Sequence, residues 1–438
     1  MRLRILVFSL LCCVAGTVLC QDTLSVEQAI EIALKNNFDI QIAKNDADIA
    51  HINNNPGNAG MLPKLNANLT DNFTYTNLDQ KLSNGTEIKQ NGVTGNSLQP
   101  GLALSWTLFD GLKMFATKNR LKQLEEVGRL NLKDTLQTMV AQVINAYYNV
   151  VSARQQLRSI TETIALYEET AKIAEKQFQV GTSSKVAMLQ AKVDLNADKS
   201  QALAQKTAIE ESKAVLNGLL GRAADTEFEV EDSIPFNVKP DLQTPDELEK
   251  NNYQIEIARR NIEIARYAKK ETFAQMLPNL TLGGGVANTG YNYNRTQSSA
   301  GFSLYNQSYG PSVGFTLTVP IFNGLVYLHQ TKVAEITILN NQFKLQKVTL
   351  QNRINYYNAM KNFETAKEAL QLEEENIGLA KENVSIALER FRVAESTAIE
   401  LRQAQQSYVE ALTRLVNARY NAKAAETELL RIQGKLVN

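Results

Sequence analysis

Two stretches of the chain, residues 101–234 and 321–438, contain no proline although each is longer than one hundred residues. Proline is the strongest helix breaker. Across Leu136–Phe178, apolar residues recur at steps of three and four, the spacing of a helix that packs along one stripe. A helix over Leu112–Val180 would be about 100 Å long at ~1.5 Å per residue, and Leu325–Val393 has the same length. No compact globular domain accommodates such helices, so the chain is expected to be elongated and mainly α-helical.

The two stretches belong to two copies of one pattern. Phe109 and Phe322, Phe178 and Phe391, and Gly221 and Gly434 are three pairs of landmarks, and each pair is separated by 213 positions. A shared offset indicates duplication. We expect a first repeat at 21–221, a linker at 222–245 and a second repeat at 246–438.

Each repeat also contains two segments in which apolar and polar side chains alternate, the pattern of a strand with one apolar face. Strands are expected at about 65–77, 102–109, 280–290 and 312–320. Polar loops at about 78–99 and 292–310 would join each strand pair, and Asp71 interrupts the first alternation without explanation. Helices are expected at about 112–180, 184–220, 325–393 and 398–434.

Residues 1–20 have the features of a secretory signal peptide. Arg2 and Arg4 precede an apolar run over Ile5–Val14, and cleavage is expected before Gln21. All three cysteines lie in this segment, so the mature chain would have none. Lipid attachment at Cys20 is the alternative, although the bulky residue before it disfavours that outcome.

The composition excludes several classes of protein. The 46 basic and 46 acidic side chains balance, so no nucleic-acid partner is expected. A mean hydropathy of −0.26 excludes a polytopic helical membrane protein. His51 and His329 are the two histidines, and neither lies in a metal-ligand spacing. We expect no catalytic, cofactor-binding or metal-binding residues, and no enzymatic activity.

Four strands are too few to close a membrane barrel, because single-chain outer-membrane barrels begin at about eight. Three chains would pool twelve. Aromatic residues near the strand ends suit a membrane interface, and they are Tyr75, Trp106, Tyr291, Tyr293 and Tyr309. A soluble β-subdomain explains the strand pattern equally well, and the helices alone fit a secreted structural scaffold or adhesin stalk without a pore.

Several motifs resemble those of the TolC-like outer membrane efflux protein family. They are the opening segment 24–37, the Leu-Pro before each first strand, Phe-Asp-Gly at 109–111, Phe-Asn-Gly at 322–324 and Phe-Gln-Val-Gly-Thr at 178–182. Each motif is weak alone, but their order covers essentially the whole mature chain.

The resemblance implies a homotrimer in the outer membrane of a Gram-negative bacterium, in contact with outer membrane lipid. The three copies would share a twelve-stranded β-barrel and a long α-helical barrel in the periplasm. This assembly would be the exit duct of a tripartite efflux pump or a type I secretion system, gated at its periplasmic helical tip. Its partners would be a periplasmic adaptor protein and an inner-membrane transporter. The sequence does not indicate which substrate is exported.

The resemblance also nominates residues at the helical tip. Counting nine residues beyond Phe391 places Glu400 at the pore entrance, with Gln403 at the family's second acidic position. Three copies of Glu400 would favour cations and bind blocking divalent ions; the alternative is an ordinary solvated helix residue. The candidate helix-tip turns and adaptor contacts are Gly181, Thr182, Ser183, Glu395, Ser396 and Thr397. Ser396 occupies the place of a family arginine that latches the closed tip, and Arg390 or Arg392 is the hypothesised substitute.

Overall fold

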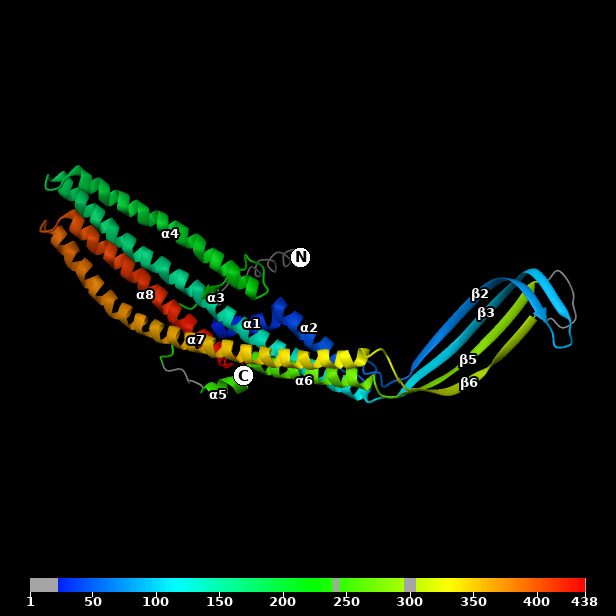
Figure 1. The fold of residues 1–438 in the computed structure, drawn as a ribbon. Coiled ribbons are helices and arrows are strands. Elements are labelled where there is room, and N and C mark those ends of the chain that lie inside the picture. Colours follow the sequence, from blue (N-terminus) through cyan, green and yellow to red (C-terminus); the bar gives the residue numbers. More distant parts are fainter. Residues whose placement is uncertain (1–22, 239–243, 295–304, 438) are drawn as a thin grey trace, which may run out of the picture. The chain divides into compact units, whose positions relative to one another are not determined.

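The computed structural model describes residues 23–238, 244–294 and 305–437. It is mainly helical with a smaller β part, as the sequence predicts (Figure 1). The expected signal peptide at 1–20, Cys20 and part of the expected linker lie outside the described residues. The helices are α1 (Val26–Asn36), α2 (Phe38–Asn53), α3 (Lys113–Gln179), α4 (Lys185–Leu219), α5 (Pro245–Asn251), α6 (Tyr253–Ala274), α7 (Val326–Arg392) and α8 (Ala398–Ile432). The strands are β1 (Thr23–Leu24), β2 (Lys64–Lys81), β3 (Glu87–Asp110), β4 (Glu229–Val230), β5 (Asn279–Asn294) and β6 (Tyr305–Thr318).

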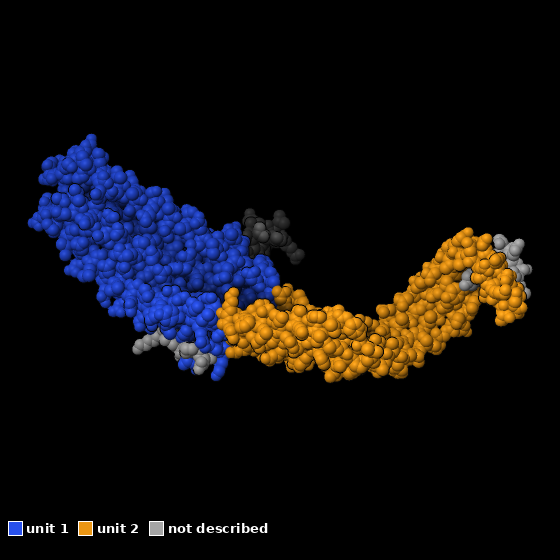
Figure 2. Space-filling model, in the orientation of Figure 1, with its two compact units in different colours: residues 1–44, 132–253, 349–438 blue, residues 45–131, 254–348 orange. Residues whose placement is uncertain are grey.

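The chain forms two compact units, coloured separately in Figure 2. Unit 1 consists of residues 1–44, 132–253 and 349–438, and unit 2 of residues 45–131 and 254–348. Unit 1 contains α4, α8 and the larger parts of α3 and α7, whereas unit 2 contains all four long strands.

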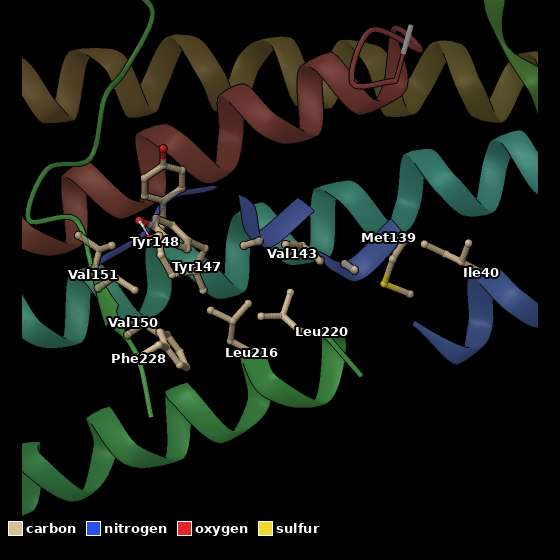
Figure 3. Close-up of a cluster of buried hydrophobic side chains, with 14 residues drawn as sticks. Ile40, Met139, Val143, Tyr147, Tyr148, Val150, Val151, Leu216, Leu220 and Phe228 are labelled. Carbon is tan, nitrogen blue, oxygen red and sulfur yellow. Dashed lines mark hydrogen bonds between the residues drawn. The ribbon is translucent and has the colours of Figure 1, made fainter. Parts of the chain in front are cut away.

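The core of unit 1 explains the first Tyr-Tyr pair of the sequence (Figure 3). The Tyr147 side chain is fully buried, and its hydroxyl donates to the Leu24 carbonyl at 2.8 Å and accepts from the Glu231 amide at 3.2 Å. The Tyr147 and Tyr148 rings meet edge to face, with centroids 5.2 Å apart. Because a buried hydroxyl must be hydrogen-bonded, Tyr147 ties α3 to the parallel β1–β4 pair and fixes where that pair packs.

Unit 2 holds one antiparallel sheet in the order β2-β3-β5-β6. The prediction of a loop at 78–99 is wrong, because most of these residues form strands. β2 continues to Lys81, β3 begins at Glu87, and the two strands stay paired from Leu78↔Gln90 to Lys81↔Glu87. This part of the hairpin lacks the apolar alternation that predicts strands, because polar and charged side chains line it instead. Of the loop expected at 292–310, the strands take 292–294 and 305–310, and residues 295–304 lie outside the described part.

The pairing register separates the sheet into two faces, and we call one of them the apolar face. Its large exposed side chains include Leu65, Leu69, Phe73, Tyr75, Leu98, Leu102, Trp106, Val286, Tyr309, Val313, Phe315 and Leu317. Along β5 this face runs from Leu280 to about Gly290, roughly 33 Å at ~3.3 Å per residue. At the ~40° strand tilt typical of outer-membrane barrels, this length would span a height of about 25 Å, which equals their lipid-facing band.

The register also accounts for Asp71. It lies on the apolar face in the row Asp71↔Leu98↔Gly290↔Gln307, and the next row outward includes Asn96. Asp71 therefore lies near the outer end of the apolar face, where Asn96 and Asn292 begin to replace apolar side chains, although Phe73 continues this face one row farther out.

Candidate functional site

The candidate site lies in unit 1, at the two turns that connect the long helices in pairs. Residues 180–184 join α3 to α4, and residues 393–397 join α7 to α8. In the first turn, the amides of Thr182 and Ser183 donate to the Gln177 carbonyl at 2.9 and 3.2 Å. Gly181 adopts φ +80°, which glycine tolerates without a steric penalty. The backbone amides of residues 180–183 are therefore all satisfied within the turn and the end of α3.

The second turn follows the same path without a glycine. Ala394 takes the left-handed conformation with φ +60°, and the Glu395 amide donates to the Arg390 carbonyl at 2.8 Å. Thr397 then caps α8 by accepting from the Glu400 amide at 3.2 Å, as Ser184 caps α4. A left-handed alanine costs about 1–2 kcal/mol, so the surrounding contacts must hold this turn in place.

Glu400 stands exposed in the first turn of α8. Its carboxylate accepts from the Ser396 hydroxyl at 2.8 Å, and a negative charge at this end of a helix is favoured by the helix dipole. Gln403 lies three residues farther along α8 and is also exposed. The single chain thus gives Glu400 a local structural role while leaving its carboxylate in contact with solvent.

The other predicted tip residues form the two turns themselves. Gly181, Thr182, Glu395 and Thr397 are exposed, whereas the side chains of Ser183 and Ser396 are partly covered. Within the chain the two turns are tied to each other, because the Gln177 side-chain amide donates to the Phe391 carbonyl at 2.8 Å.

A buried apolar cluster lies just behind the second turn. Phe391 is 3% exposed and packs with Ala174, Leu388 and Leu401. These residues come from α3, α7 and α8, so the cluster joins the two helix pairs at their tips.

The two arginines proposed as latches behave differently. The Arg392 guanidinium leaves α7 and forms an ion pair with Glu169 on α3. Arg390 instead donates to the Glu395 carbonyl at 3.2 Å within its own turn. Of the two arginines, only Arg392 therefore connects the α7–α8 pair to the α3–α4 pair. Both members of its ion pair are about half exposed, so the pair contributes little beyond about 1 kcal/mol.

Two further polar links between α3 and α8 are not apparent from the sequence. The buried Gln405 side chain donates to the Thr170 hydroxyl at 2.8 Å, and the Tyr408 hydroxyl donates to Glu162 at 2.7 Å. Burial raises the pKa of Tyr408 above its usual value, and donation to the Glu162 carboxylate raises it further. The partners are more than 230 residues apart; the available signal was polar residues placed on the apolar seams of α3 and α8.

None of the helices among the described residues combines the length and apolarity needed to cross a membrane. Large apolar side chains are nevertheless exposed on the sheet and along α4 and α7. On α7, Ile336, Phe343, Leu350 and Tyr357 are exposed at intervals of seven, and Leu372, Leu379 and Ile386 continue the spacing after one shift. Such stripes are typical of helices that pack against a partner helix.

A protein-family model described as "Outer membrane efflux protein" matches residues 29–222 and 244–435 of the chain. The probable outer membrane lipoprotein SilC of Salmonella typhimurium is 26% identical over 343 residues, which cover 73% of this chain and 67% of SilC. The alkaline protease secretion protein AprF of Pseudomonas aeruginosa is 22% identical over 415 residues, which cover 91% and 82%. The cation efflux system protein CusC of Escherichia coli K12 is 25% identical over 348 residues, which cover 73% and 68%.

Solved structures share the fold. A crystal structure of CusC superposes with a TM-score of 0.76 at 18% identity and covers 93% of this chain and 91% of the CusC chain. The outer membrane protein VceC of Vibrio cholerae superposes with a TM-score of 0.75 at 16% identity and covers 93% and 96%.

Proposed function

The chain belongs to the outer membrane efflux protein family, and from that premise we propose that three copies of it assemble into the exit duct of an export machine. The family is one of transport channels, and its location is the outer membrane. The finer proposal is a homotrimeric duct for a tripartite efflux pump or a type I secretion system, docked to a periplasmic adaptor and an inner-membrane transporter. Relatives named for cation efflux and for protease secretion support both kinds of machine.

The observation that carries the proposal is the open sheet. Strands β2 and β6 are its two edges, and neither edge pairs with another strand among the described residues. A membrane excludes unpaired strand edges because no water can satisfy their backbone groups, and the apolar face has the height of a lipid-facing band. Pairing β6 of one copy with β2 of the next removes every edge, and three copies of four strands reach twelve.

The exposed stripes on the outer helices support the same assembly. In addition to the α7 stripe, α4 exposes Val186, Leu189, Val193 and Leu203. Uncovered apolar stripes of this extent mark interaction surfaces in soluble surroundings. In the proposed trimer, α4 of one copy covers the half of α7 nearest the tip in its neighbour, since α4 has 35 residues and α7 has 67.

At the tip we propose that Glu400 from each copy forms an acidic ring, with Gln403 one turn behind it. Residues 181–183 and 395–397 would contact the adaptor. Because the contacts of the single chain already hold the two turns together through Phe391, Gln177 and Arg392, opening the tip requires the helix pairs to separate. We also propose that the two repeats at 21–221 and 246–438 each supply one strand pair and one helix pair.

The test is the conductance of the purified protein in planar bilayers. We expect discrete cation-preferring channels that divalent ions block from the tip side. Glu400→Gln should lower the cation preference and weaken the block. Glu410→Gln is the matched control, because Glu410 is an exposed acid on the same helix, about 80° away around its axis. A structural stalk would give no channels at all, and unchanged selectivity in Glu400→Gln would exclude the acidic ring.

A further inference from the structure

The face of the sheet opposite the apolar face carries no charge over its whole central part. It is formed by alternate positions of residues 66–76, 95–107, 281–291 and 306–316. These positions hold Asn, Ser, Thr, Gln, Gly and Ala, together with Tyr291, and none of them holds Asp, Glu, Lys or Arg. We call this surface the neutral face. It is unusual in this chain, in which 21% of all residues are charged.

Most of the charges that border the neutral face are compensated locally. In the outer part of the hairpin, Lys81 lies 2.9 Å from Glu87 and Lys89 lies 3.4 Å from Asp79. At the helical end, the Asp110 carboxylate accepts from the Met114 amide at 2.9 Å and so caps the start of α3. Lys64 is the exception at the helical end: it lies on the same side of the sheet directly opposite Ser105 and is exposed, with no ion pair among the residues described. The area between these borders is electrically neutral.

The side chains of the neutral face are also mostly small, so its surface is nearly flat. A Cβ atom at Gly285 would lie 2.3 Å from the Leu102 carbonyl oxygen, and one at Gly101 would lie 3.2 Å from the Val286 carbonyl oxygen. The backbones of β3 and β5 therefore approach too closely for a side chain at Gly285. The one large side chain described on this face is Tyr291, which receives a hydrogen bond from the Gln99 amide at 3.4 Å and so lies along the sheet. Its place opposite Ser97 shows that the expectation of a membrane-interface role for Tyr291 is wrong, because it lies on the side away from the apolar face.

We infer that the neutral face walls a charge-neutral section of the passage, which accepts hydrated cargo of either sign. This inference rests on the proposed duct, because it requires the apolar face to meet lipid. Rings of charged side chains are what make a pore select by charge. Cargo in this section meets only hydroxyl, amide and backbone groups, which hydrogen-bond cations and anions alike. Selection by charge is therefore confined to the helical part of the duct.

Adding one charge to the neutral face tests the inference. Asn68 lies on the neutral face of β2 directly opposite Gly101, so a longer side chain has room there. We would compare Asn68→Lys with Asn68→Asp, and measure reversal potentials across planar bilayers under a salt gradient. The expected result is a shift of about twofold or more in the cation-to-anion permeability ratio, toward anions for lysine and toward cations for aspartate. The two shifts should be equal in size, because the wall that receives the new charge is neutral.

Gln307→Lys and Gln307→Asp are the matched controls. Gln307 is exposed in the same row as Asp71 on the apolar face, where a charge already occurs, and its variants should leave the ratio unchanged. If the Asn68→Lys protein does not assemble, Ser312→Lys replaces it, since Ser312 lies on the neutral face opposite Gly285.

The outcomes separate this inference from the proposed function. If the wild-type protein forms no channels, the proposed duct itself is wrong. If it conducts and neither Asn68 variant shifts the ratio, the neutral face does not wall the passage. If lysine and aspartate shift the ratio by clearly unequal amounts, the section carries charge of its own and the inference is overturned.

Discussion

The two helix-tip turns have nearly the same backbone path but opposite environments. Phe178 and Phe391 occupy equivalent positions, yet Phe178 is 38% exposed whereas Phe391 is 3% exposed. The first turn has glycine at its left-handed position and the second has alanine. The two turns are thus similar in backbone but differ in packing. The second turn is anchored by its buried aromatic ring, whereas the aromatic ring of the first turn is partly exposed to solvent.

Replacing Phe178 and Phe391 with alanine should give the largest difference between the two turns. Phe391→Ala opens a cavity among Ala174, Leu388 and Leu401 and should lower the free energy of unfolding by about 3–5 kcal/mol. Phe178→Ala removes a partly exposed ring and should cost less than about 1 kcal/mol. Urea titration of both purified variants at one protein concentration, followed by circular dichroism, measures the difference. Equal losses would contradict the anchored role of Phe391.

Exchanging glycine and alanine at the left-handed position of each turn should have the next largest effect. Gly181→Ala forces a Cβ into a φ of +80° and should destabilise the protein by about 1–2 kcal/mol, whereas Ala394→Gly relieves the strain and should stabilise it by a similar amount. The same urea titration reads out both variants. Changes of the same sign would show that the turns are not governed by backbone strain.

The ion pair between the helix pairs should have a smaller effect. Arg392→Gln removes the link to Glu169, and Arg390→Gln removes only a contact inside the second turn. A loss of up to about 1 kcal/mol from the closed state would raise the open probability of single channels by about fivefold at most. Arg390→Gln serves as the control and should open no more often than wild type. If Arg392→Gln gates normally, the ion pair with Glu169 does not hold the tip closed.

A carboxylate present in one repeat and absent from the other should give the smallest effect. Asp198 on α4 corresponds to the fully buried Ala411 on α8. Burial raises the pKa of Asp198, partly offset by the Thr163 hydroxyl, which donates to it at 2.9 Å. Because the pKa of Asp198 is raised in the folded protein, ionising its carboxyl group lowers the free energy of unfolding. The contribution of the protonated carboxyl group to stability is therefore present in acid and is lost as the pH rises through the pKa of the folded state. Asp198→Asn should therefore stabilise the protein by less than about 1 kcal/mol at pH 7, and the gain should vanish in acid. A gain that is the same at both pH values would contradict burial as the cause.

Helix periodicity and the absence of proline predicted the long helices from Lys113 and from Val326 well, because each helix repeats its apolar stripe many times. The extension of β2 to Lys81 was missed because a strand outside the apolar band has no reason to alternate. Asp71 could be placed only from the register, which puts it opposite Leu98 and in the same row as Gln307 near the outer end of the apolar face.

The candidate site was less accessible to sequence reasoning. The turns were visible from Gly181 and from the pattern shared with the second repeat. The partners of Arg392, Gln177 and Gln405 were not, because those contacts join helices that are far apart in the sequence. Which of two equivalent aromatic residues is buried depends on the neighbouring helix pair, and a single repeat carries no information about its neighbour.

The central claim is that the four-stranded sheet is completed by two further copies of the chain. Native mass spectrometry of the protein extracted from outer membranes in mild detergent tests this directly. The account predicts a particle of three chains that dissociates only under denaturing conditions. A stable single chain, or a particle whose number of chains is not three, would contradict it.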